Sequence, residues 1–250
     1  MARVVVDTDG RLLDDSDHDH SFDHFDGRLA VFATPGIENW FHWLIQALPR
    51  MISLTDEDFD AIHVPPNLTK PQELSLQRAL EASGLSRRAI FRTVGKVRAR
   101  GVIAPEIAWH PSRGDPLPLP VLHFVRSLAR IHPSPRRRIY VSRRGYSRFS
   151  PSLEALMGIV IDVIDPSIMT FDEQASAFAS ADLIVAPHGS GLANLVFCSP
   201  GTRVVELYDP RRIGKTFCGV YSKLASAAGC FHRHVSINEA GSDVHRNSDR

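Results

Sequence analysis

The sequence predicts an α/β protein with parallel β-sheet, and three observations support this prediction. Short β-branched or apolar segments alternate with segments of helical period along most of the chain. Strands that alternate with helices of this length indicate parallel strands joined by right-handed crossovers. The 250 residues include 43% hydrophobic and 23% charged side chains, ordinary values that exclude collagen-like, coiled-coil and wholly disordered chains.

The first half of the chain is expected to contain four strands and two helices. Residues 14–26 carry six aspartates and three histidines without a periodic apolar face, so we expect an exposed loop there. Apolar side chains recur at helical spacing over residues 39–54, which predicts an amphipathic helix that Pro49 bends or divides. A second helix is expected over residues 73–83, ended by Gly84. The expected strands are residues 4–6, 29–34, 61–64 and 89–94.

Residues 110–121, HPSRGDPLPLPV, are the best candidate for a linker. Four prolines in ten residues are incompatible with a helix interior or a central strand. We therefore expect an N-terminal domain over residues 1–115 and a C-terminal domain over residues 116–238. Residues 239–250 have almost no apolar content and are expected to form a loose tail.

The C-terminal half repeats the alternation of helix and strand more regularly. Helices are expected over residues 121–131, 151–157, 172–180, 192–197 and 214–228. Strands are expected over residues 138–142, 159–164, 183–186, 203–207 and 231–237.

Residues 183–206, LIVAPHGSGLANLVFCSPGTRVVE, contain the most informative motif of the chain. A strand is followed by the turn His188-Gly189-Ser190-Gly191 and then by a helix. Such a turn presents backbone N–H groups at a helix N-terminus, and its glycines let a phosphate approach the backbone. Glu206 ends the next strand, where a carboxylate can accept hydrogen bonds from ribose hydroxyls. The alternative is a tight turn that needs glycine for its geometry alone, since Asn194 replaces the third glycine of a dinucleotide fingerprint.

Eight arginines and no acidic residue lie between Arg126 and Arg148. Arg143 and Arg144 follow a predicted strand, at the sheet edge where α/β proteins bind ligands, and guanidinium groups suit a phosphate. A solvated basic face and a nucleic-acid patch are the alternatives. The formal charge of +1 and the lack of an RNA-binding signature argue against nucleic acid. Together with the glycine turn, the arginines predict a diphosphate ligand.

His42 lies between two tryptophans near the start of the first helix, in the segment NWFHW. An imidazole at the mouth of a cleft is a natural general base near neutral pH. A histidine packed in the core is the alternative interpretation of the same residue.

Asp7 suggests a different enzyme class, because VVVDTDG over residues 4–10 looks like the start of a haloacid-dehalogenase-type phosphatase. Arg11 replaces the threonine expected there, and Asp162 and Asp165 are poor substitutes for the late acidic magnesium motif. The histidines and aspartates of residues 17–26 could ligate a metal, but their spacing is not that of a preorganised site. Three cysteines exclude a disulfide scaffold. With no signal peptide or membrane span, we expect a cytoplasmic protein, either free or peripheral at the inner membrane face.

Three blocks, in this order, resemble the family-61 glycosyltransferases, which include bacterial capsular-polysaccharide-type enzymes and eukaryotic O-linked GlcNAc and xylan-decorating transferases. The blocks are residues 39–51 (NWFHWLIQALPRM), 138–144 (RIYVSRR) and 169–206. The last is the most specific, since it pairs a Phe-x-Glu-Gln helix with a His-Gly-x-Gly-Leu-x-Asn turn. Gln46 stands where the family often has aspartate.

The resemblance implies two Rossmann-like domains of the GT-B type, here with an abbreviated N-terminal domain. It further implies an inverting glycosyltransferase without metal or other cofactor. The donor would be a nucleotide sugar, with UDP the expected nucleotide, and the acceptor a glycan or lipid-linked glycan of capsular or cell-surface polysaccharide synthesis. His42 would be the base, with Asn39 and Arg50 on the acceptor side. The donor-binding residues would be Arg143, Arg144, His188, Gly189, Ser190, Gly191, Asn194 and Glu206. A degenerate transferase that binds without turnover is the non-enzymatic alternative.

Overall fold

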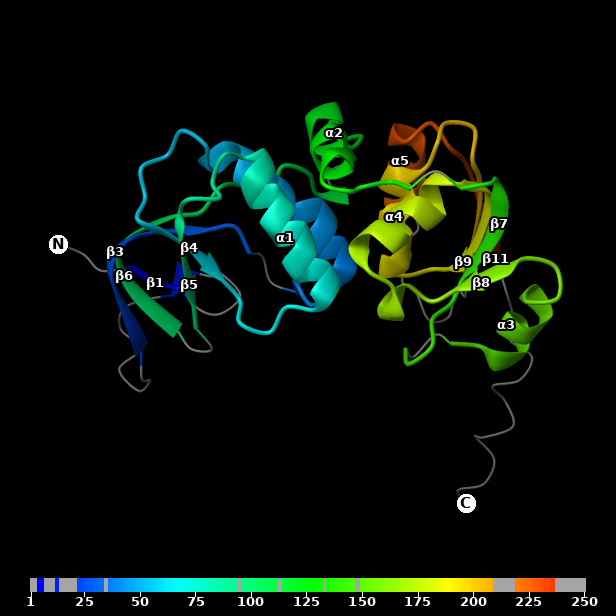
Figure 1. Cartoon of the computed structure of the whole chain (residues 1–250), viewed down its shortest axis with the longest axis horizontal. Helices are drawn as coiled ribbons and strands as arrows, with labels where there is room; N and C mark the ends of the chain where they lie inside the picture. The colour runs from blue at the N-terminus through cyan, green and yellow to red at the C-terminus, as the bar shows by residue number, and fades with distance from the viewer. Residues whose placement is uncertain are drawn as a thin grey trace, which may run out of the picture.

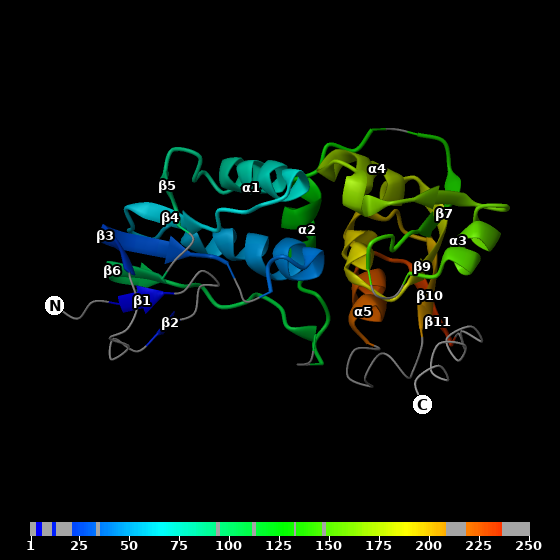
Figure 2. The ribbon, with the colours of Figure 1, turned by 90° about the horizontal axis from the view of Figure 1, so that it is seen from below.

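The protein is described here by a computed structural model that covers residues 4–6, 12–13, 22–33, 36–93, 96–111, 114–132, 134–146, 149–208 and 219–236. It contains two β-sheets, one from each half of the chain, at opposite ends of the long axis (Figure 1). Helical segments from both halves fill the space between the sheets, as the view from below also shows (Figure 2). The mixed α/β class with parallel sheet predicted from the sequence is confirmed.

The first sheet has the order β2-β1-β6-β3-β4-β5. Strands β3, β4, β5 and β6 are parallel, whereas β1 runs antiparallel to both β2 and β6. The strands are β1 (Val4–Val6), β2 (Leu12–Leu13), β3 (Phe22–Val31), β4 (Ala61–Val64), β5 (Ala89–Arg92) and β6 (Lys96–Ile103).

The second sheet is entirely parallel, with the order β11-β10-β9-β7-β8. In chain order this is the 2-1-3-4-5 arrangement of a doubly wound sheet, in which the direction of winding reverses between β7 and β9. Ligands of such sheets bind at the carboxyl ends of the strands at this reversal. The strands are β7 (Arg137–Val141), β8 (Asp162–Ile164), β9 (Ala181–Pro187), β10 (Arg203–Tyr208) and β11 (Phe231–Ser236).

The helical segments begin and end at residues with clear local causes. Thr69 and Gln72 form a capping box at the start of α1, and Thr170 and Glu173 form another at α4. Gly84, with φ of +67°, follows the end of α1 in the left-handed region. The segments are α1 (Lys70–Ala82), α2 (Leu119–Ser127), α3 (Pro151–Met157), α4 (Phe171–Ala179), α5 (Val220–Ala227), the π-helical η1 (His42–Ala47), and the 3₁₀ segments η2 (Leu48–Leu54), η4 (Pro166–Ile168) and η5 (Ser190–Phe197).

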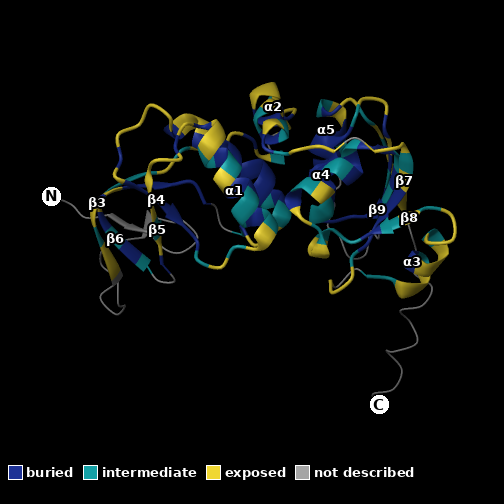
Figure 3. Cartoon of the chain, in the orientation of Figure 1, coloured by how far each residue is buried: buried dark blue, intermediate teal, exposed yellow. Residues whose placement is uncertain are grey.

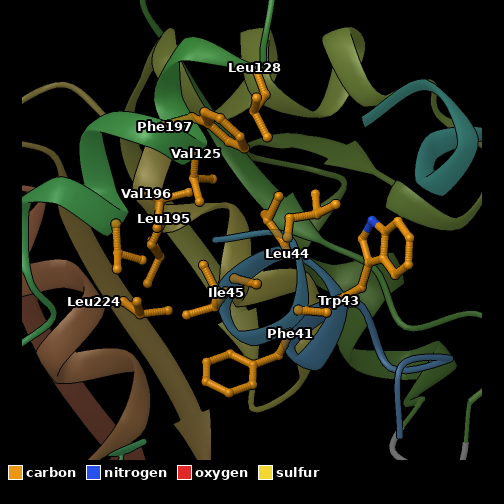
Figure 4. Packing of buried hydrophobic residues seen from close by; sticks show 14 of the residues in the cluster. Phe41, Trp43, Leu44, Ile45, Val125, Leu128, Leu195, Val196, Phe197 and Leu224 are labelled. Carbon is orange, nitrogen blue, oxygen red and sulfur yellow. The ribbon is translucent and has the colours of Figure 1, made fainter. Parts of the chain in front are cut away.

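One apolar core joins the two halves of the chain. Buried residues concentrate where the central helical segments face one another (Figure 3). Side chains of η1 pack there against α2, η5 and α5, in a cluster whose labelled members are Phe41, Trp43, Leu44, Ile45, Val125, Leu128, Leu195, Val196, Phe197 and Leu224 (Figure 4). The ion pair between Arg78 of α1 and Asp172 of α4 adds a polar connection between the halves. The halves are therefore held in one arrangement by both apolar and charged contacts.

Two predictions in the first sheet are wrong. Residues 22–26, expected to be loop, form the start of β3, while residues 14–21 lie outside the described residues. Within the described residues this part of β3 pairs with β6, and its acidic side chains have polar partners: Asp23 accepts a hydrogen bond from Thr93, and Asp26 pairs with Arg100. Strand β6, at the centre of the sheet, was also not expected, although its basic and apolar residues alternate as in a half-buried strand.

Three further elements differ from expectation in type or length. The helix expected over residues 39–54 is π-helical and then 3₁₀, and it changes type at Leu48, directly before Pro49, which has no N–H to donate. The strand expected over residues 159–164 is limited to β8, because turns after α3 take up residues 158–161 and leave Ile159 and Val160 exposed. The helix expected to begin at Leu192 begins at Ser190 as a 3₁₀ segment.

Several expectations concern residues that the structure does not describe. They include Asp7, residues 17–21 of the acidic run, the start of the last helix at residues 214–218, and the tail at 239–250. Within the described residues, no helix combines the length and the apolar content that crossing a bilayer requires.

Candidate functional site

A cavity of about 420 Å³ lies at the carboxyl ends of β7, β8 and β9, where the winding of the second sheet reverses. Residues that follow each of these strands line it: Ser142, Arg143 and Tyr146 after β7, Asp165, Pro166 and Ser167 after β8, and Gly189, Ser190 and Gly191 after β9. The N-terminal half supplies the opposite wall, with Glu38, Asn39, Trp40, Thr69 and Gln72. The cavity thus occupies the position that the strand order predicts for a ligand, between the two halves.

Arg143 lies directly against the glycine turn. Its Nη1 donates a hydrogen bond to the carbonyl oxygen of His188 at 3.2 Å, and its guanidinium lies 5.3 Å from the ring centre of Tyr146. A Cβ atom added at Gly189 would be 1.3 Å from that Nη1, so only glycine leaves room for the guanidinium. Glycine is therefore needed at position 189 because the guanidinium of Arg143 lies so close to its backbone. This cationic side chain also lines the cavity.

The turn leads into η5, where the first backbone N–H groups have no hydrogen-bond acceptor among the described residues. The first hydrogen bond of the segment runs from Leu192 N–H to the carbonyl of Gly189 at 2.9 Å, so the N–H groups of Ser190 and Gly191 precede it. Both residues line the cavity beside Arg143. A guanidinium and helix-terminal N–H groups that face one cavity form a site suited to an anion.

Asn194 connects the turn to the rest of the site. Its amide nitrogen donates to Gln174 Oε1 at 3.0 Å and to the Gly191 carbonyl at 3.2 Å. Its oxygen accepts from the indole nitrogen of Trp40 at 3.1 Å, across the two halves. Asn194 is fully buried and does not line the cavity, whereas Gln174 and Trp40 do. The side chain predicted to bind donor thus holds the cavity wall together.

Arg144 and Arg50 do not line the cavity. Arg144 follows Arg143 but pairs with Glu154 of α3, with Nε 2.7 Å from Oε1. Arg50 donates to the carbonyl oxygens of Pro105, Phe32 and Ala33, and burial lowers its pKa to about 10. Both guanidinium groups therefore have structural partners in this arrangement.

The two other predicted residues of the N-terminal half, Asn39 and His42, differ in their relation to the cavity. Asn39 lines it, and its side-chain oxygen accepts from the N–H of Phe41. His42 does not line it, but the ring lies against Gly36, in the turn that carries Glu38 and Asn39. Nδ1 of His42 is 2.5 Å from Oε1 of Gln46. With the amide oxygen as acceptor, the proton is on Nδ1 and the lone pair is on Nε2.

His188 and Glu206 turn inward, away from the cavity wall. Nδ1 of His188 hydrogen-bonds to Oε1 of Glu206. The other oxygen, Oε2, is 2.8 Å from Nε2 of His232 and 3.1 Å from Nε2 of His234. Although burial raises the pKa of Glu206, the hydrogen bonds from His188 and His232 outweigh it and lower the pKa to about 2. Glu206 is an ionised carboxylate surrounded by three imidazoles, and it does not line the cavity.

A second cavity, of about 400 Å³, lies beside Arg126, His132, Ser180 and Cys198. It is near the start of β9 rather than at the carboxyl ends of the strands. Its guanidinium, that of Arg126, donates to the carbonyl oxygens of Val196 and Cys198. The first cavity combines a cation, backbone donors and the expected position in the sheet, and we take it as the candidate site.

Several residues of this site were not expected from the sequence. Trp40, Tyr146 and Gln174 line the cavity. Of these, only Gln174 belongs to the most specific of the three sequence blocks, in its Phe-x-Glu-Gln helix. The position of Tyr146, three residues after Arg143, could have indicated stacking on the guanidinium.

The doubly wound sheet, with its glycine turn and arginine at the point of reversal, identifies an α/β protein of the class whose ligand sites lie at the carboxyl ends of the strands. Comparison with family models then gives the family. The Glycosyltransferase 61 model matches residues 40–205, which is well over half of the chain, and the protein belongs to this family of glycosyltransferases. No curated protein sequence matches it. The recognition made from the three sequence blocks is confirmed, and membership implies a nucleotide-sugar donor and a glycan acceptor.

The phosphatase alternative has no structural support. The strand before Asp7, β1, runs antiparallel to β6, so its carboxyl end lies at the opposite sheet edge from those of β3, β4 and β6. Sites in open α/β sheets lie outside the carboxyl ends of parallel strands. Asp7 itself lies outside the described residues.

Proposed function

We propose that this protein is an inverting, metal-independent glycosyltransferase that binds its donor diphosphate in the cavity between the two halves. The observation that supports this most is Arg143 lying against Gly189 at the point of reversal of the second sheet. The donor would be a UDP-sugar and the acceptor a glycan or lipid-linked glycan. Capsular or cell-surface polysaccharide synthesis in the cytoplasm, at the inner face of the membrane, is the role that we assign.

The charge that develops on the leaving nucleoside diphosphate can be stabilised by groups of this chain. Arg143 offers two-pronged hydrogen bonds to phosphate oxygens, and the N–H groups of Ser190 and Gly191 add dipoles that need no reorganisation. The ring of Tyr146 lies beside the guanidinium, with its centre 5.3 Å from Cζ. These donors would take the part that a divalent ion has in metal-dependent transferases.

The acceptor would approach from the N-terminal half, in a GT-B-type arrangement of two Rossmann-like domains. Glu38, Asn39 and Trp40 line the cavity from the N-terminal half. His42 would take the acceptor proton at Nε2, since Gln46 holds Nδ1. Inversion follows if the acceptor oxygen attacks from this side while the diphosphate leaves toward Arg143.

Asn194, His188 and Glu206 would be positioning residues in this scheme. Asn194 fixes Gly191 and Trp40, one on each wall. Glu206 hydrogen-bonds to the imidazole of His188 and so fixes it. The backbone carbonyl oxygen of His188 accepts a hydrogen bond from Arg143. Neither carboxylate nor imidazole needs to touch the donor to influence its binding.

Binding without turnover is a second candidate, favoured by one observation. The partner of His42 is the neutral amide of Gln46 rather than a carboxylate. A carboxylate would stabilise the imidazolium that forms when a histidine accepts a proton, and an amide does so less. A protein that binds donor normally but transfers no sugar would support this second candidate.

Thermal unfolding with a panel of nucleotides tests the proposal. UDP at 100 times its Kd adds about 2.7 kcal/mol to the free energy of unfolding, which is a clear rise in Tm. We expect this rise in EDTA, with UMP giving less and with no dependence on added Mg²⁺. Stabilisation that disappears in EDTA and returns with Mg²⁺ would contradict metal-independent binding. No stabilisation by any nucleoside diphosphate would contradict the site itself.

A further inference from the structure

The imidazoles of His232 and His234 converge on one carboxylate oxygen of Glu206. The three residues lie on neighbouring parallel strands, where Glu206 of β10 is in register with His234 of β11. His232 is two residues earlier on β11, so its side chain is on the same face of the sheet. This alternation places two ring nitrogens and one carboxylate oxygen within 4.8 Å of one another.

The geometry matches what a tetrahedral zinc ion requires. Zinc bonds to imidazole nitrogen and to carboxylate oxygen at about 2.0–2.2 Å, so that two ligand atoms at a tetrahedral angle are about 3.3 Å apart. In the structure Oε2 of Glu206 is 2.8 Å from Nε2 of His232 and 3.1 Å from Nε2 of His234. Each of these nitrogens needs to separate from Oε2 by about half an ångström or less to admit the ion, and all three ligand atoms already lie within 4.8 Å of one another.

The surroundings of the three ligands resemble those of functional metal sites. Oε1 of Glu206, the oxygen that faces away from the two histidines of β11, hydrogen-bonds to Nδ1 of His188. Partners of this kind orient a ligating carboxylate and are part of the binding energy of metal sites. His232 and Glu206 are buried, whereas the side chain of His234 is 34% exposed and gives the ion a route from solvent.

We propose that Glu206, His232 and His234 form a binding site for a divalent transition-metal ion, Zn²⁺ foremost. Three protein ligands leave a fourth position for water or another small donor. The ion would tie the edge strand β11 to β10, because one ligand is on β10 and two are on β11. None of the three lines the candidate donor cavity, so the ion is not the counter-ion of the diphosphate.

The site is connected to the donor cavity through His188. That imidazole bonds to Glu206, and its backbone carbonyl accepts from Arg143. Bound zinc would therefore stabilise one orientation of Glu206 and His188 beside the glycine turn. This makes the ion a structural support for the C-terminal half, independent of whether the protein transfers sugar.

Isothermal titration of EDTA-treated and desalted protein with ZnCl₂, without nucleotide, tests the proposal. We expect the wild type to bind zinc, and H232Q or H234Q to weaken this binding more than about 100-fold. H188Q should weaken it about 10- to 100-fold, which is the typical loss for a residue that hydrogen-bonds to a metal ligand. H123Q, which changes an exposed histidine of α2, is the matched control and leaves affinity unchanged. Zinc should also raise the Tm of the wild type but not of H234Q.

Two further readouts make the result unambiguous. Each variant is melted in EDTA, where H234Q should match the wild type within a few degrees because His234 is on the surface. Co²⁺ replaces Zn²⁺ as a spectroscopic probe, and its visible band for a four-coordinate site should disappear in H234Q. Failure of the protein to bind zinc would overturn the proposal. Zinc binding of unchanged affinity in H232Q and H234Q would also overturn it, because the ion would then bind at other residues, for example within 14–26. Because nucleotide binding is measured in EDTA, failure of one proposal leaves the other intact.

Discussion

Replacing Gly189 with alanine should displace Arg143 from the glycine turn and leave the fold intact. The new Cβ would be 1.3 Å from Nη1 and 2.5 Å from Cζ of the guanidinium. Those atoms are the far end of a flexible side chain, so the guanidinium moves and the backbone does not. The backbone at Gly189 is extended, with φ of 164°, which alanine adopts without strain.

The expected loss of affinity follows from the contact that is displaced. A hydrogen bond that involves a charged group contributes about 1.5–3 kcal/mol, and Arg143 is proposed to make such bonds to the diphosphate. Removing it should raise the Kd for UDP by about 10- to 150-fold. The free energy of unfolding should change by no more than about 1 kcal/mol, since alanine also restricts the unfolded chain.

Calorimetric titration of UDP in EDTA measures this change, with G219A as the matched control. A Cβ at Gly219 would meet no heavy atom within 4 Å, so its affinity for UDP should equal that of the wild type. The decisive comparison is a double-mutant cycle with R143A. If alanine at 189 acts only by displacing Arg143, then G189A should have no further effect in the R143A background. Unchanged affinity in G189A, or effects that simply add, would refute the reasoning.

Three other variants test the rest of the account. H42A should keep donor affinity within a few-fold and slow transfer by about 10²–10⁴; a lower Tm with every property weakened together would instead identify a core histidine. D172N should lower the free energy of unfolding in urea by about 2 kcal/mol, because it breaks the ion pair with Arg78. Burial raises the pKa of Asp172, but the hydrogen bonds from Arg78 and from the Arg130 N–H, together with the charge of Arg78, outweigh burial and hold the pKa below the usual 3.8. The stability that depends on this charge is therefore present above pH 3.8 and is lost as the pH falls through the folded pKa. The free energies of unfolding of wild type and D172N should converge there. A difference between them that stays constant down to about pH 2 would contradict this prediction. D7N should leave UDP binding unchanged, whereas Mg²⁺-dependent hydrolysis of p-nitrophenyl phosphate that D7N abolishes would restore the phosphatase.

The sequence was sufficient for those parts of the fold whose signal is local. Strands 61–64 and 203–207 and the helix at 151–157 carry apolar periodicity and end signals within their own residues. Residues 22–26 of β3 are mostly polar and carry no strand pattern of their own, whereas the alternation of basic and apolar residues in β6 is a strand pattern. The pairing of the two segments joins residues about 75 positions apart, which the sequence does not reveal.

The candidate site was predictable in its backbone and less so in its side chains. Gly189 and Arg143 could be placed because each follows a strand of a parallel sheet. In such sheets, ligands bind as a rule at the edge where the strands end. Arg144, its neighbour, is bound by Glu154, and Arg50 is bound by three carbonyl groups. Such partners depend on tertiary packing, so a charged side chain in a motif cannot be assigned to a ligand from spacing alone.

Glu206 illustrates the same limit most clearly. Its place at the end of a strand suggested contact with ribose, yet three histidines surround its carboxylate. Two of them, His232 and His234, come from the last described strand, far along the chain from the glycine motif. Their alternation on β11 was visible in the sequence, but its meaning depended on knowing that β11 lies beside β10.

The most direct test of the central claim is to follow the reaction by proton NMR with methanol as a surrogate acceptor. UDP-glucose, UDP-N-acetylglucosamine and UDP-xylose, which are α-linked donors, are incubated with the wild type and with R143A in EDTA. The account predicts that the wild type converts one of them to UDP and a methyl β-glycoside, whose configuration cannot re-equilibrate, and that R143A forms far less. A methyl α-glycoside, a reaction that requires Mg²⁺, or equal product from R143A would contradict it.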